Sequence, residues 1–265
     1  MNYKNLCLEV IKLSKETGSF FLQEIHKVKA SDIEVKGLHD FVSYVDKTAE
    51  KLIVKRLSAL LPEAGFLTEE ETANQKGERF NWVIDPLDGT TNFLHHLPVF
   101  SVSIALMEFD KVVLGVVYEP NLAECFYAWK GGKAYCNEKE IHVSDQSEMK
   151  NTLLATGFPY NDYGRMKEYI GLFRYFAENT AGLRRFGSAA VDLAYTACGR
   201  FEGFYEYGLH PWDVAAGAFI LQQAGGSVSD YSGGSNYIFG EELLASNTLL
   251  HSELLKVIQT HFGKL

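Results

Sequence analysis

A run of short, closely spaced strands in the middle of the chain restricts the fold more than any other feature. The apolar pattern predicts strands at residues 101–109, 111–118, 123–130 and 133–137. Only short turns separate them, such as the Gly131-Gly132 pair. Parallel strands need crossover connections of roughly a dozen residues or more, so these strands are expected to form an antiparallel meander.

Helices are predicted on both sides of this meander. Before it, residues 2–28 and 46–61 have apolar side chains at helical spacing, and Pro62 ends the second helix. After it, the pattern predicts strands at 152–158 and 201–207 and helices at 164–177, 189–198, 212–224 and the C-terminus. This order predicts a layered α/β sandwich (αβαβα) with a largely antiparallel first sheet, divided into halves at residues 1–147 and 148–265.

Composition and charge exclude several classes of protein. The 265 residues carry a formal net charge of −9, whereas a nucleic-acid binder would more commonly show a basic patch. No run approaches the ~18 apolar residues that cross a bilayer, and the amphipathic N-terminus lacks the apolar core of a signal peptide. We therefore expect a cytoplasmic protein with no nucleic-acid and no membrane partner. The four cysteines are widely scattered, which indicates neither a zinc site nor a redox dithiol.

The segment NWVIDPLDGTTNF is the first candidate site. A buried apolar strand is expected to end at Asp85, where Pro86 would prevent its continuation as a central strand. A bend between Asp85 and Asp88 can direct both carboxylates into one space, and Gly89 allows a ligand to approach the backbone closely. A short helix beginning there would add free N–H groups that favour an anion. The alternative is an ordinary strand-end turn with Asp88 as a helix N-cap.

Further acidic residues occur where other elements begin or end. Glu69 belongs to three consecutive glutamates after an apolar pair, and Glu206 ends a predicted strand. Asp46 and Asp213 occur where helices are expected to begin. Each has an ordinary alternative: a solvated acidic turn for Glu69, and a helix N-cap or first-turn position for Asp46 and Asp213. His210 precedes the last of these helices and is a plausible ligand, although a lone histidine beside a proline and a tryptophan is more often structural.

A shared pocket would make these acids chemically informative. Like charges a few ångströms apart repel one another in a partly buried site, so they would either protonate or hold cations. A ligand set of oxygens, without cysteine or a histidine pair, suits Mg²⁺ better than Mn²⁺ or Ca²⁺. Such a cation would also supply the local positive charge that an acidic protein needs to bind a phosphate.

Two motifs together resemble the signatures of the inositol monophosphatase family, within the superfamily of lithium-sensitive, magnesium-dependent phosphatases. They are WVIDPLDGTTNF and WDVAAGAFILQQAGG, in the order and at the spacing of the family. The resemblance extends over nearly the whole chain through DFVSYVD, GFLTEEE, GVVYEP and RRFGSAAVDLAYTACGRFEGFYE. It implies the family's sandwich fold and hydrolysis of a small phosphate monoester.

The resemblance also implies ligands for two or three Mg²⁺ ions. These are the carboxylates of Glu69, Asp85, Asp88 and Asp213 and the main-chain carbonyl of Leu87. The first three carboxylates lie in the 1–147 half, and Asp213 lies in the 148–265 half with the alcohol-binding residues. A slip of one residue would make Glu70 the ligand instead of Glu69.

Roles in catalysis and substrate binding are implied in the same way. Asp46 and Thr90 would orient the attacking water, and Glu69 is counted with them as catalytic. The Gly-Thr pair after the second aspartate would hold the phosphate through backbone N–H groups, whereas Glu206 and the backbone of Ala189 would hold the alcohol's hydroxyls. The residues expected to touch the substrate are Asp88, Gly89, Thr90, Ser188, Ala189, Glu206 and Asp213.

Inositol monophosphate is the expected substrate, and water activated by the metal would attack in line without a covalent intermediate. Members of the superfamily hydrolyse fructose-1,6-bisphosphate, histidinol phosphate or 3′-phosphoadenosine 5′-phosphate, which are the alternative substrates. Arg184 and Arg185 could serve a second phosphate or a dimer partner. A non-catalytic regulatory protein on the same fold is a further alternative. The family also implies a homodimer and sensitivity to lithium.

Overall fold

A computed structural model describes residues 1–37, 40–73, 75–159 and 163–263. The α-helices are α1 (Tyr3–Glu24), α2 (Tyr44–Leu60), α3 (Thr90–Leu94), α4 (Met166–Asn179), α5 (Ala189–Ala197), α6 (Pro211–Gln223) and α7 (His251–Phe262). None of these helices, within the described ranges, combines the length and the apolar character that a membrane crossing requires. The strands are β1 (Ile33–Gly37), β2 (Asp40–Ser43), β3 (Gly65–Thr68), β4 (Phe80–Asp88), β5 (Ser101–Glu108), β6 (Lys111–Glu119), β7 (Glu124–Trp129), β8 (Ala134–Cys136), β9 (Lys139–Glu140), β10 (Leu153–Thr156), β11 (Gly182–Arg184), β12 (Gly203–Tyr207), β13 (Ser227–Ser229) and β14 (Glu242–Ser246).

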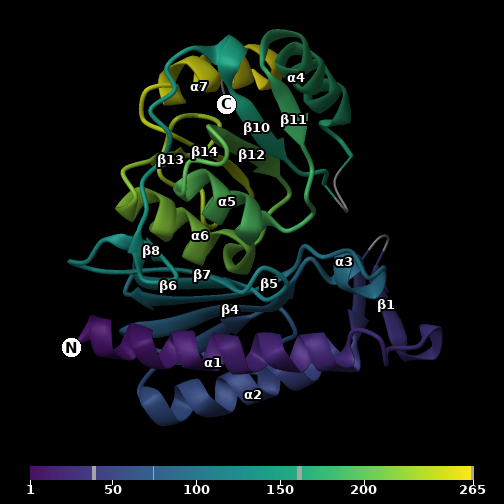
Figure 1. The fold of residues 1–265 in the computed structure, drawn as a ribbon, viewed down its shortest axis with the longest axis vertical. Coiled ribbons are helices and arrows are strands. Elements are labelled where there is room, and N and C mark those ends of the chain that lie inside the picture. Colours follow the sequence, from purple (N-terminus) through teal and green to yellow (C-terminus); the bar gives the residue numbers. More distant parts are fainter. Residues whose placement is uncertain (38–39, 74, 160–162, 264–265) are drawn as a thin grey trace.

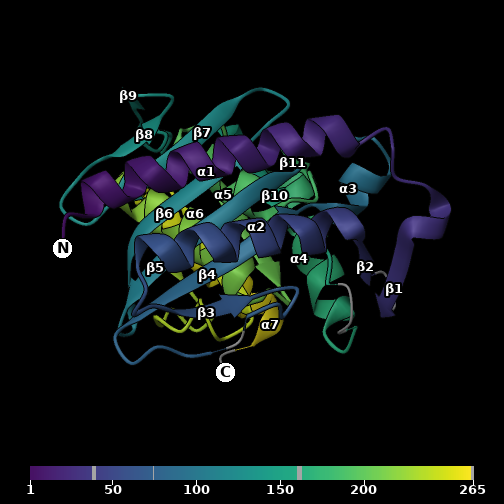
Figure 2. The same ribbon diagram turned by 90° about the horizontal axis from the view of Figure 1, so that it is seen from below.

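Helices and sheets alternate in layers through the molecule (Figure 1). α1 and α2 lie side by side across the outer face of the first sheet, as Figure 2 shows from below. α5 and α6 lie between the two sheets, and α4 and α7 cover the outer face of the second sheet (Figure 1). This arrangement confirms the predicted αβαβα sandwich.

The first sheet has seven strands in the order β3-β4-β5-β6-β7-β8-β9. β3 runs parallel to β4, and the other neighbouring pairs are antiparallel, which confirms the predicted meander. The second sheet has five strands in the order β11-β10-β12-β14-β13. β10 is parallel to both of its neighbours, whereas β14 is antiparallel to both of its own. β1 and β2 form a separate two-stranded sheet.

The prediction that a strand ends at Asp85 is wrong. β4 runs from Phe80 to Asp88, and its pairing with β5 shifts register between Asp85 and Asp88. Such a bulge inserts extra residues into one strand of a pair, and Pro86 falls within it. β3 pairs no further along β4 than Ile84, so on that side the missing N–H of Pro86 removes no ladder hydrogen bond. The bulge therefore allows one strand to carry both aspartates.

The start of α2 also differs from expectation, because the N-cap is Ser43 and not Asp46. Asp46 occupies the third helical position, where its Oδ2 accepts hydrogen bonds from the backbone N–H of Ser43 at 2.9 Å and from the Ser43 hydroxyl at 2.7 Å. This capping box satisfies the first turn of the helix and orients the carboxylate. Asp46 is thereby buried, with Oδ1 directed to a partner outside the helix.

The two middle helices are largely buried because they pack against each other and against both sheets. All residues of α5 are buried, and in α6 the buried residues run from Val214 to Leu221. Both helices share one hydrophobic core with strands of the two sheets. Gly115 of β6 permits this close packing, since a Cβ there would lie only 2.7 Å from the carbonyl oxygen of Ala216. The packing fixes the start of α6, and with it Asp213, relative to the first sheet.

Candidate active site

Asp85 lies at the centre of a group of acidic side chains. It is 2% exposed, and its Oδ1 accepts a hydrogen bond from the backbone N–H of Leu87 at 2.9 Å. Loss of hydration raises the pKa of Asp85 well above its ordinary value, and the neighbouring charges of Glu69, Asp88 and Asp213 raise it further. Glu69, Asp88 and Asp213 thus lie near enough for their charges to act on Asp85, and these are the carboxylates that the sequence interpretation assigns to one site.

The glutamate that faces this group is Glu69, directly after β3. Its backbone N–H donates to the carbonyl of Ile84 at 3.2 Å, and its side chain is hydrogen-bonded to Asp85. The next residue, Glu70, is held through its backbone N–H by a carboxylate oxygen of Glu50 at 2.8 Å. This geometry favours Glu69 over Glu70 as the candidate ligand.

Glu50 positions the turn that carries Glu69, and the sequence interpretation misses it. The residue is fully buried on the inner face of α2. Its second carboxylate oxygen, Oε1, accepts hydrogen bonds from the backbone N–H of Thr72 at 2.8 Å and from the Thr72 hydroxyl at 2.7 Å. The signal in the sequence is a glutamate one helical turn after Asp46, on the same face as apolar residues.

We expect Glu50→Gln to weaken metal binding at the candidate site, although Glu50 is not itself a candidate ligand. Glutamine replaces one acceptor oxygen by an amide nitrogen, which cannot accept from an N–H group. The free energy of unfolding in urea should fall by roughly 2 kcal/mol, as for a lost hydrogen bond to a charged group. The Mg²⁺ concentration for half-maximal activity should rise about tenfold, because residues behind metal ligands orient them.

A matched control for this change is Glu63→Gln, since Glu63 is exposed just after α2. It should alter neither stability nor magnesium dependence. If Glu50→Gln lowered stability but left the magnesium dependence unchanged, Glu50 would be structural only.

Asp88 is held by the start of α5. Its Oδ2 accepts hydrogen bonds from the Ser188 hydroxyl at 2.5 Å and from the backbone N–H of Ala190 at 2.8 Å. Burial raises the pKa of Asp88 to about 6, although these hydrogen bonds act to lower it. Ser188 also caps α5 through the N–H of Val191, so its hydroxyl is directed at Asp88. Ala189 is the first residue of that helix, beside the same aspartate.

Asp213 belongs to the first turn of α6. Its Oδ2 accepts a hydrogen bond from the backbone N–H of His210 at 2.6 Å. Asp213 is partly exposed, yet loss of hydration and the charge of Asp88 raise its pKa to about 8. His210 precedes the helix, and its ring stacks on Trp212 with centroids 5.0 Å apart. These contacts agree with a structural role for His210.

Asp46 contacts Thr90, although α2 and α3 are far apart in the sequence. The Thr90 hydroxyl oxygen lies 3.1 Å from Oδ1 of Asp46 and 2.9 Å from the carbonyl oxygen of Leu87, and it can donate to either. Loss of hydration raises the pKa of Asp46, while the hydrogen bonds from Ser43 and Thr90 act in the opposite direction. A carboxylate and a hydroxyl in contact can orient a water molecule and accept its proton.

The turn before α3 is seated against the segment that precedes α5. Gly89 is the N-cap of α3 and has a φ of 92°, a conformation that favours glycine. A Cβ at Gly89 would lie 3.2 Å from the carbonyl oxygen of Gly187. Asn92 joins the same segments, because its Nδ2 donates to the carbonyls of Val99 and Phe186, both at 2.7 Å. Both halves of the chain therefore shape the candidate phosphate turn.

Glu206 marks another end of the site, on β12. It is 6% exposed, and its carboxyl group packs so closely on Gly157 that a Cβ there would lie 2.0 Å from it. Burial raises the pKa of Glu206 well above its ordinary value, and the charge of Arg185 lowers it. Asp192 of α5, which the sequence interpretation misses, is buried as well, and its pKa is raised by burial and by Glu206. Within the described residues its Oδ1 has no hydrogen-bond partner.

The donor set around Asp85 fits a hard divalent cation such as Mg²⁺, because all candidate ligands are carboxylate or carbonyl oxygens. Across the described ranges, no three His, Cys, Asp or Glu side chains are gathered closely enough to enclose an ion by themselves. Mg²⁺ is commonly held by one or two carboxylates, with water and substrate phosphate completing its shell. A complete protein cage is therefore not required. The pKa values of Asp85, Asp88 and Asp213 are raised mainly by burial, and a bound cation would favour the ionised form of each carboxylate.

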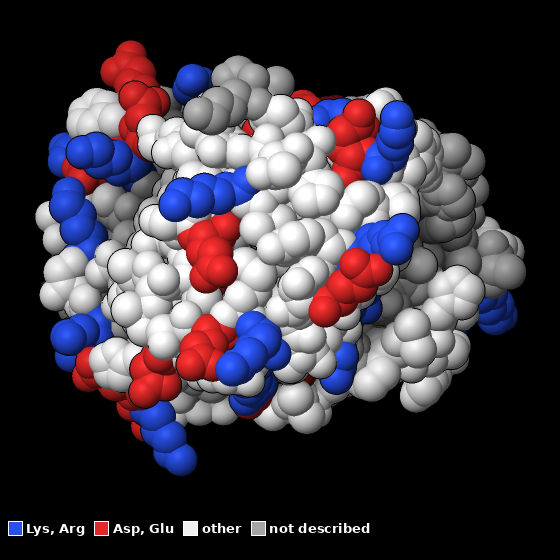
Figure 3. Space-filling view, turned by 90° about the horizontal axis from the view of Figure 1, so that it is seen from above, with Lys and Arg blue, Asp and Glu red and all other residues white. Residues whose placement is uncertain are grey.

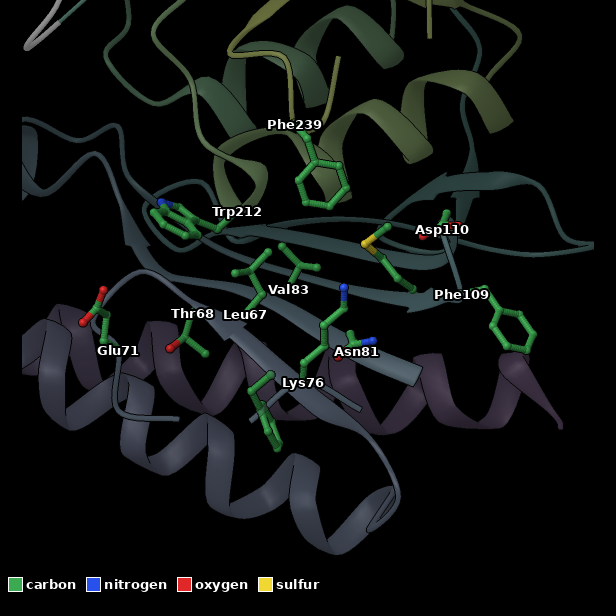
Figure 4. A pocket seen from close by; sticks show the side chains of 12 residues that line it. Leu67, Thr68, Glu71, Lys76, Asn81, Val83, Phe109, Asp110, Trp212 and Phe239 are labelled. Atoms are coloured by element: carbon green, nitrogen blue, oxygen red, sulfur yellow. The ribbon is translucent and has the colours of Figure 1, made fainter. Parts of the chain in front are cut away.

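A cavity of about 430 Å³ adjoins the acidic group (Figure 4). Its wall includes Thr68 and Trp212, the residues immediately before Glu69 and Asp213. Most of the remaining lining is apolar, and Figure 4 shows Lys76 directed toward this space from the side opposite Phe239. The side chains of the four acidic residues do not line it, so it is distinct from the candidate active site.

The family model described as "Inositol monophosphatase family" matches residues 5–262. The chain belongs to the inositol monophosphatase family. The resemblance inferred from two motifs is confirmed by this match. A relative within the curated proteins is an inositol-1-monophosphatase of Mesorhizobium japonicum, 37% identical over 251 residues and covered to 94% in both chains. Another is the Nus factor SuhB of Pseudomonas aeruginosa, 38% identical over 256 residues, with 95% of this chain and 94% of the relative covered.

Solved structures of similar proteins have the same fold. The extragenic suppressor protein suhB of Bartonella henselae superimposes with a TM-score of 0.90 at 37% identity, covering 94% of this chain and 96% of that one. The IMPase of Thermotoga maritima gives a TM-score of 0.86 at 35% identity, with 95% of both chains covered. The predicted fold class is confirmed by these similarities.

Proposed function

We propose that this protein hydrolyses a small phosphate monoester, with inositol monophosphate as the preferred substrate and Mg²⁺ as the cofactor. The observation that carries the proposal is the contact between Asp46 and Thr90 next to the acidic group around Asp85. The similarity to an inositol-1-monophosphatase supports the substrate class. The proposal needs no serine or cysteine nucleophile.

Asp46 and Thr90 would position the attacking water and take its proton. Burial raises the pKa of Asp46 and so makes it a better proton acceptor than an exposed carboxylate. When Thr90 donates to Asp46 or to the Leu87 carbonyl, the lone pairs of its hydroxyl oxygen can accept from the water. The backbone N–H groups of Gly89 and Thr90 would orient the phosphate for attack in line with the leaving alcohol.

The carboxylates of Glu69, Asp85, Asp88 and Asp213 and the carbonyl of Leu87 would hold the metal. When bound, Mg²⁺ neutralises the phosphate oxygens and makes a water molecule more acidic. Ser188 and Ala190 would keep Asp88 in its orientation, as residues behind metal ligands commonly do. Glu206 would receive the hydroxyls of the alcohol, away from the reacting bond.

Phosphate release from a panel of substrates tests this proposal. The panel is inositol 1-phosphate, fructose-1,6-bisphosphate, histidinol phosphate and 3′-phosphoadenosine 5′-phosphate, each with Mg²⁺, with EDTA and with Mg²⁺ plus Li⁺. We expect inositol 1-phosphate to be hydrolysed fastest, EDTA to abolish activity and Li⁺ to inhibit it. Activity that persists in EDTA would contradict the proposal. Faster hydrolysis of another member of the panel would change the proposed substrate but leave the proposed reaction, hydrolysis of a phosphate monoester, unchanged.

A second candidate role is that of a regulatory binding protein on the same fold, favoured by the names of relatives. The proteins named Nus factor SuhB from Pseudomonas aeruginosa and from Escherichia coli are 38% and 39% identical to this chain. A nucleic-acid surface concentrates lysine and arginine, whereas Figure 3 shows both signs of charge interspersed on one face of the molecule. A folded protein without activity on the whole panel would favour this second role, with a protein partner.

A further inference from the structure

Arg185 lies between the candidate phosphate turn and the end of the site marked by Glu206. Its Nη1 would lie 2.5 Å from a Cβ at Gly187, so the guanidinium rests on the backbone of that glycine. The same Cβ position is 3.2 Å from the side-chain amide of Asn92, which belongs to α3. On another side, the guanidinium carbon lies 5.6 Å from the centre of the Phe158 ring, within the range of a cation–π contact.

The neighbour of Phe158 connects this arginine to Glu206. Gly157 precedes Phe158 and packs directly on the Glu206 carboxyl group. Arg185 and Glu206 thus flank the same two-residue segment. The charge of Arg185 also lowers the pKa of Glu206 and of Asp192, which burial raises. Two buried carboxylates close to each other require a compensating charge, and Arg185 supplies one.

We propose that Arg185 is a specificity-determining positioning residue, which holds the Glu206 carboxylate where it accepts hydrogen bonds from the hydroxyls of the leaving alcohol. The inference rests on the proposed phosphatase function. Glu206 offers carboxyl oxygens to hydroxyl groups at this end of the site, and the charge of Arg185 favours the ionised form of that carboxyl group. Arg185 is then a counter-charge and not the receptor for a bisphosphate.

Two substrates with different alcohols distinguish a role of Arg185 in binding the alcohol from an effect on the phosphate or on the fold. Inositol 1-phosphate offers hydroxyls to Glu206, whereas 4-nitrophenyl phosphate has the same phosphate and no hydroxyl on its ring. We expect Arg185→Gln to lower kcat/KM for inositol 1-phosphate about tenfold or more, mainly through KM, because a hydrogen bond to a charged group is lost. The value for 4-nitrophenyl phosphate should stay within about twofold, since that ester makes no such hydrogen bond.

Two further variants complete the experiment. Arg185→Lys keeps the charge and should restore most of the lost kcat/KM for inositol 1-phosphate. Arg184→Gln is the matched control, because Arg184 is exposed and donates to the carbonyl of Leu183, away from Glu206. This control should leave kcat/KM unchanged for both substrates.

Two results would overturn the inference. An equal loss of kcat/KM for both esters in Arg185→Gln would mean that Arg185 acts on the phosphate or on the fold. A loss confined to fructose-1,6-bisphosphate would make Arg185 a receptor for a second phosphate. If the wild-type protein is inactive on every ester with Mg²⁺, both the proposed function and this inference are rejected. If the wild type is active and Arg185→Gln leaves the ratio of kcat/KM for the two esters unchanged, only the inference is rejected.

Discussion

Asp85→Asn is expected to remove nearly all phosphatase activity while the protein stays folded. The change preserves the shape of the side chain and the oxygen that accepts from the N–H of Leu87. It removes the central charge of the acidic group, which the proposed mechanism uses to hold Mg²⁺ against the phosphate. Loss of one major electrostatic group costs roughly 3 kcal/mol or more of transition-state stabilisation, so kcat should fall at least about 10²-fold.

The fold of Asp85→Asn serves as the internal control for that loss. Asp85 carries a raised pKa because it is buried beside three other acids, so removal of its charge relieves repulsion in the metal-free protein. The unfolding temperature in EDTA should therefore be equal to or higher than that of the wild type. Asp145→Asn makes the same chemical change at an exposed position and should leave kcat unchanged. Near-normal turnover of Asp85→Asn would contradict the assignment of Asp85 as a metal ligand.

The metal-free protein is expected to become more stable as the pH is lowered from about 8 toward 4. Burial raises the pKa of Asp88 to about 6 and that of Asp213 to about 8, from the ordinary value of 3.8. Between the ordinary and the raised values, the folded chain binds protons that the unfolded chain has released. The free energy of unfolding therefore falls as the pH rises through this window. We expect a difference on the order of 5 kcal/mol between about pH 5 and about pH 8.

Urea unfolding in EDTA at a series of pH values measures this dependence. Saturating Mg²⁺ should flatten the curve, because it stabilises the ionised carboxylates of the folded chain and displaces their protons. Asp213→Asn should flatten it also, since the group with the higher pKa is then missing. Stability that rises with pH in EDTA would show that Asp88 and Asp213 are not buried in the metal-free protein.

The sequence predicts those features of the site that depend on neighbouring residues. Several acids of the site can be found in the sequence because each stands beside a proline, a glycine or the start of an apolar helix, as at Asp85 and Asp213. The layer order follows from the lengths of connections, since short turns permit only antiparallel neighbours. These signals are local, and the family resemblance adds roles to them without any knowledge of contacts.

The features that the sequence interpretation misses depend on contacts between distant segments. In the sequence, Glu50 is one of two acids of α2. Only the structure shows that it accepts a hydrogen bond from the turn at Glu70. Ser188 is directed at Asp88 because the start of α5 lies beside the end of β4, a contact that no local pattern encodes. The bulge at Pro86 is similar: a proline within an apolar strand indicates an end unless the neighbouring strand is known to stop first.

The contact between Gly89 and Gly187 also joins a turn made early in the chain to a segment made much later. During synthesis, the residues of the first sheet, with Glu69, Asp85 and Asp88, are made before the segment at Gly187 and the helix that bears Asp213. Repulsion among the early acids is then relieved by water and not by the opposing wall. The proposed metal site would therefore be complete only once α5 and α6 have docked. A ligand that touches both walls would therefore slow the separation of the two sheets, and so lengthen the lifetime of the whole fold.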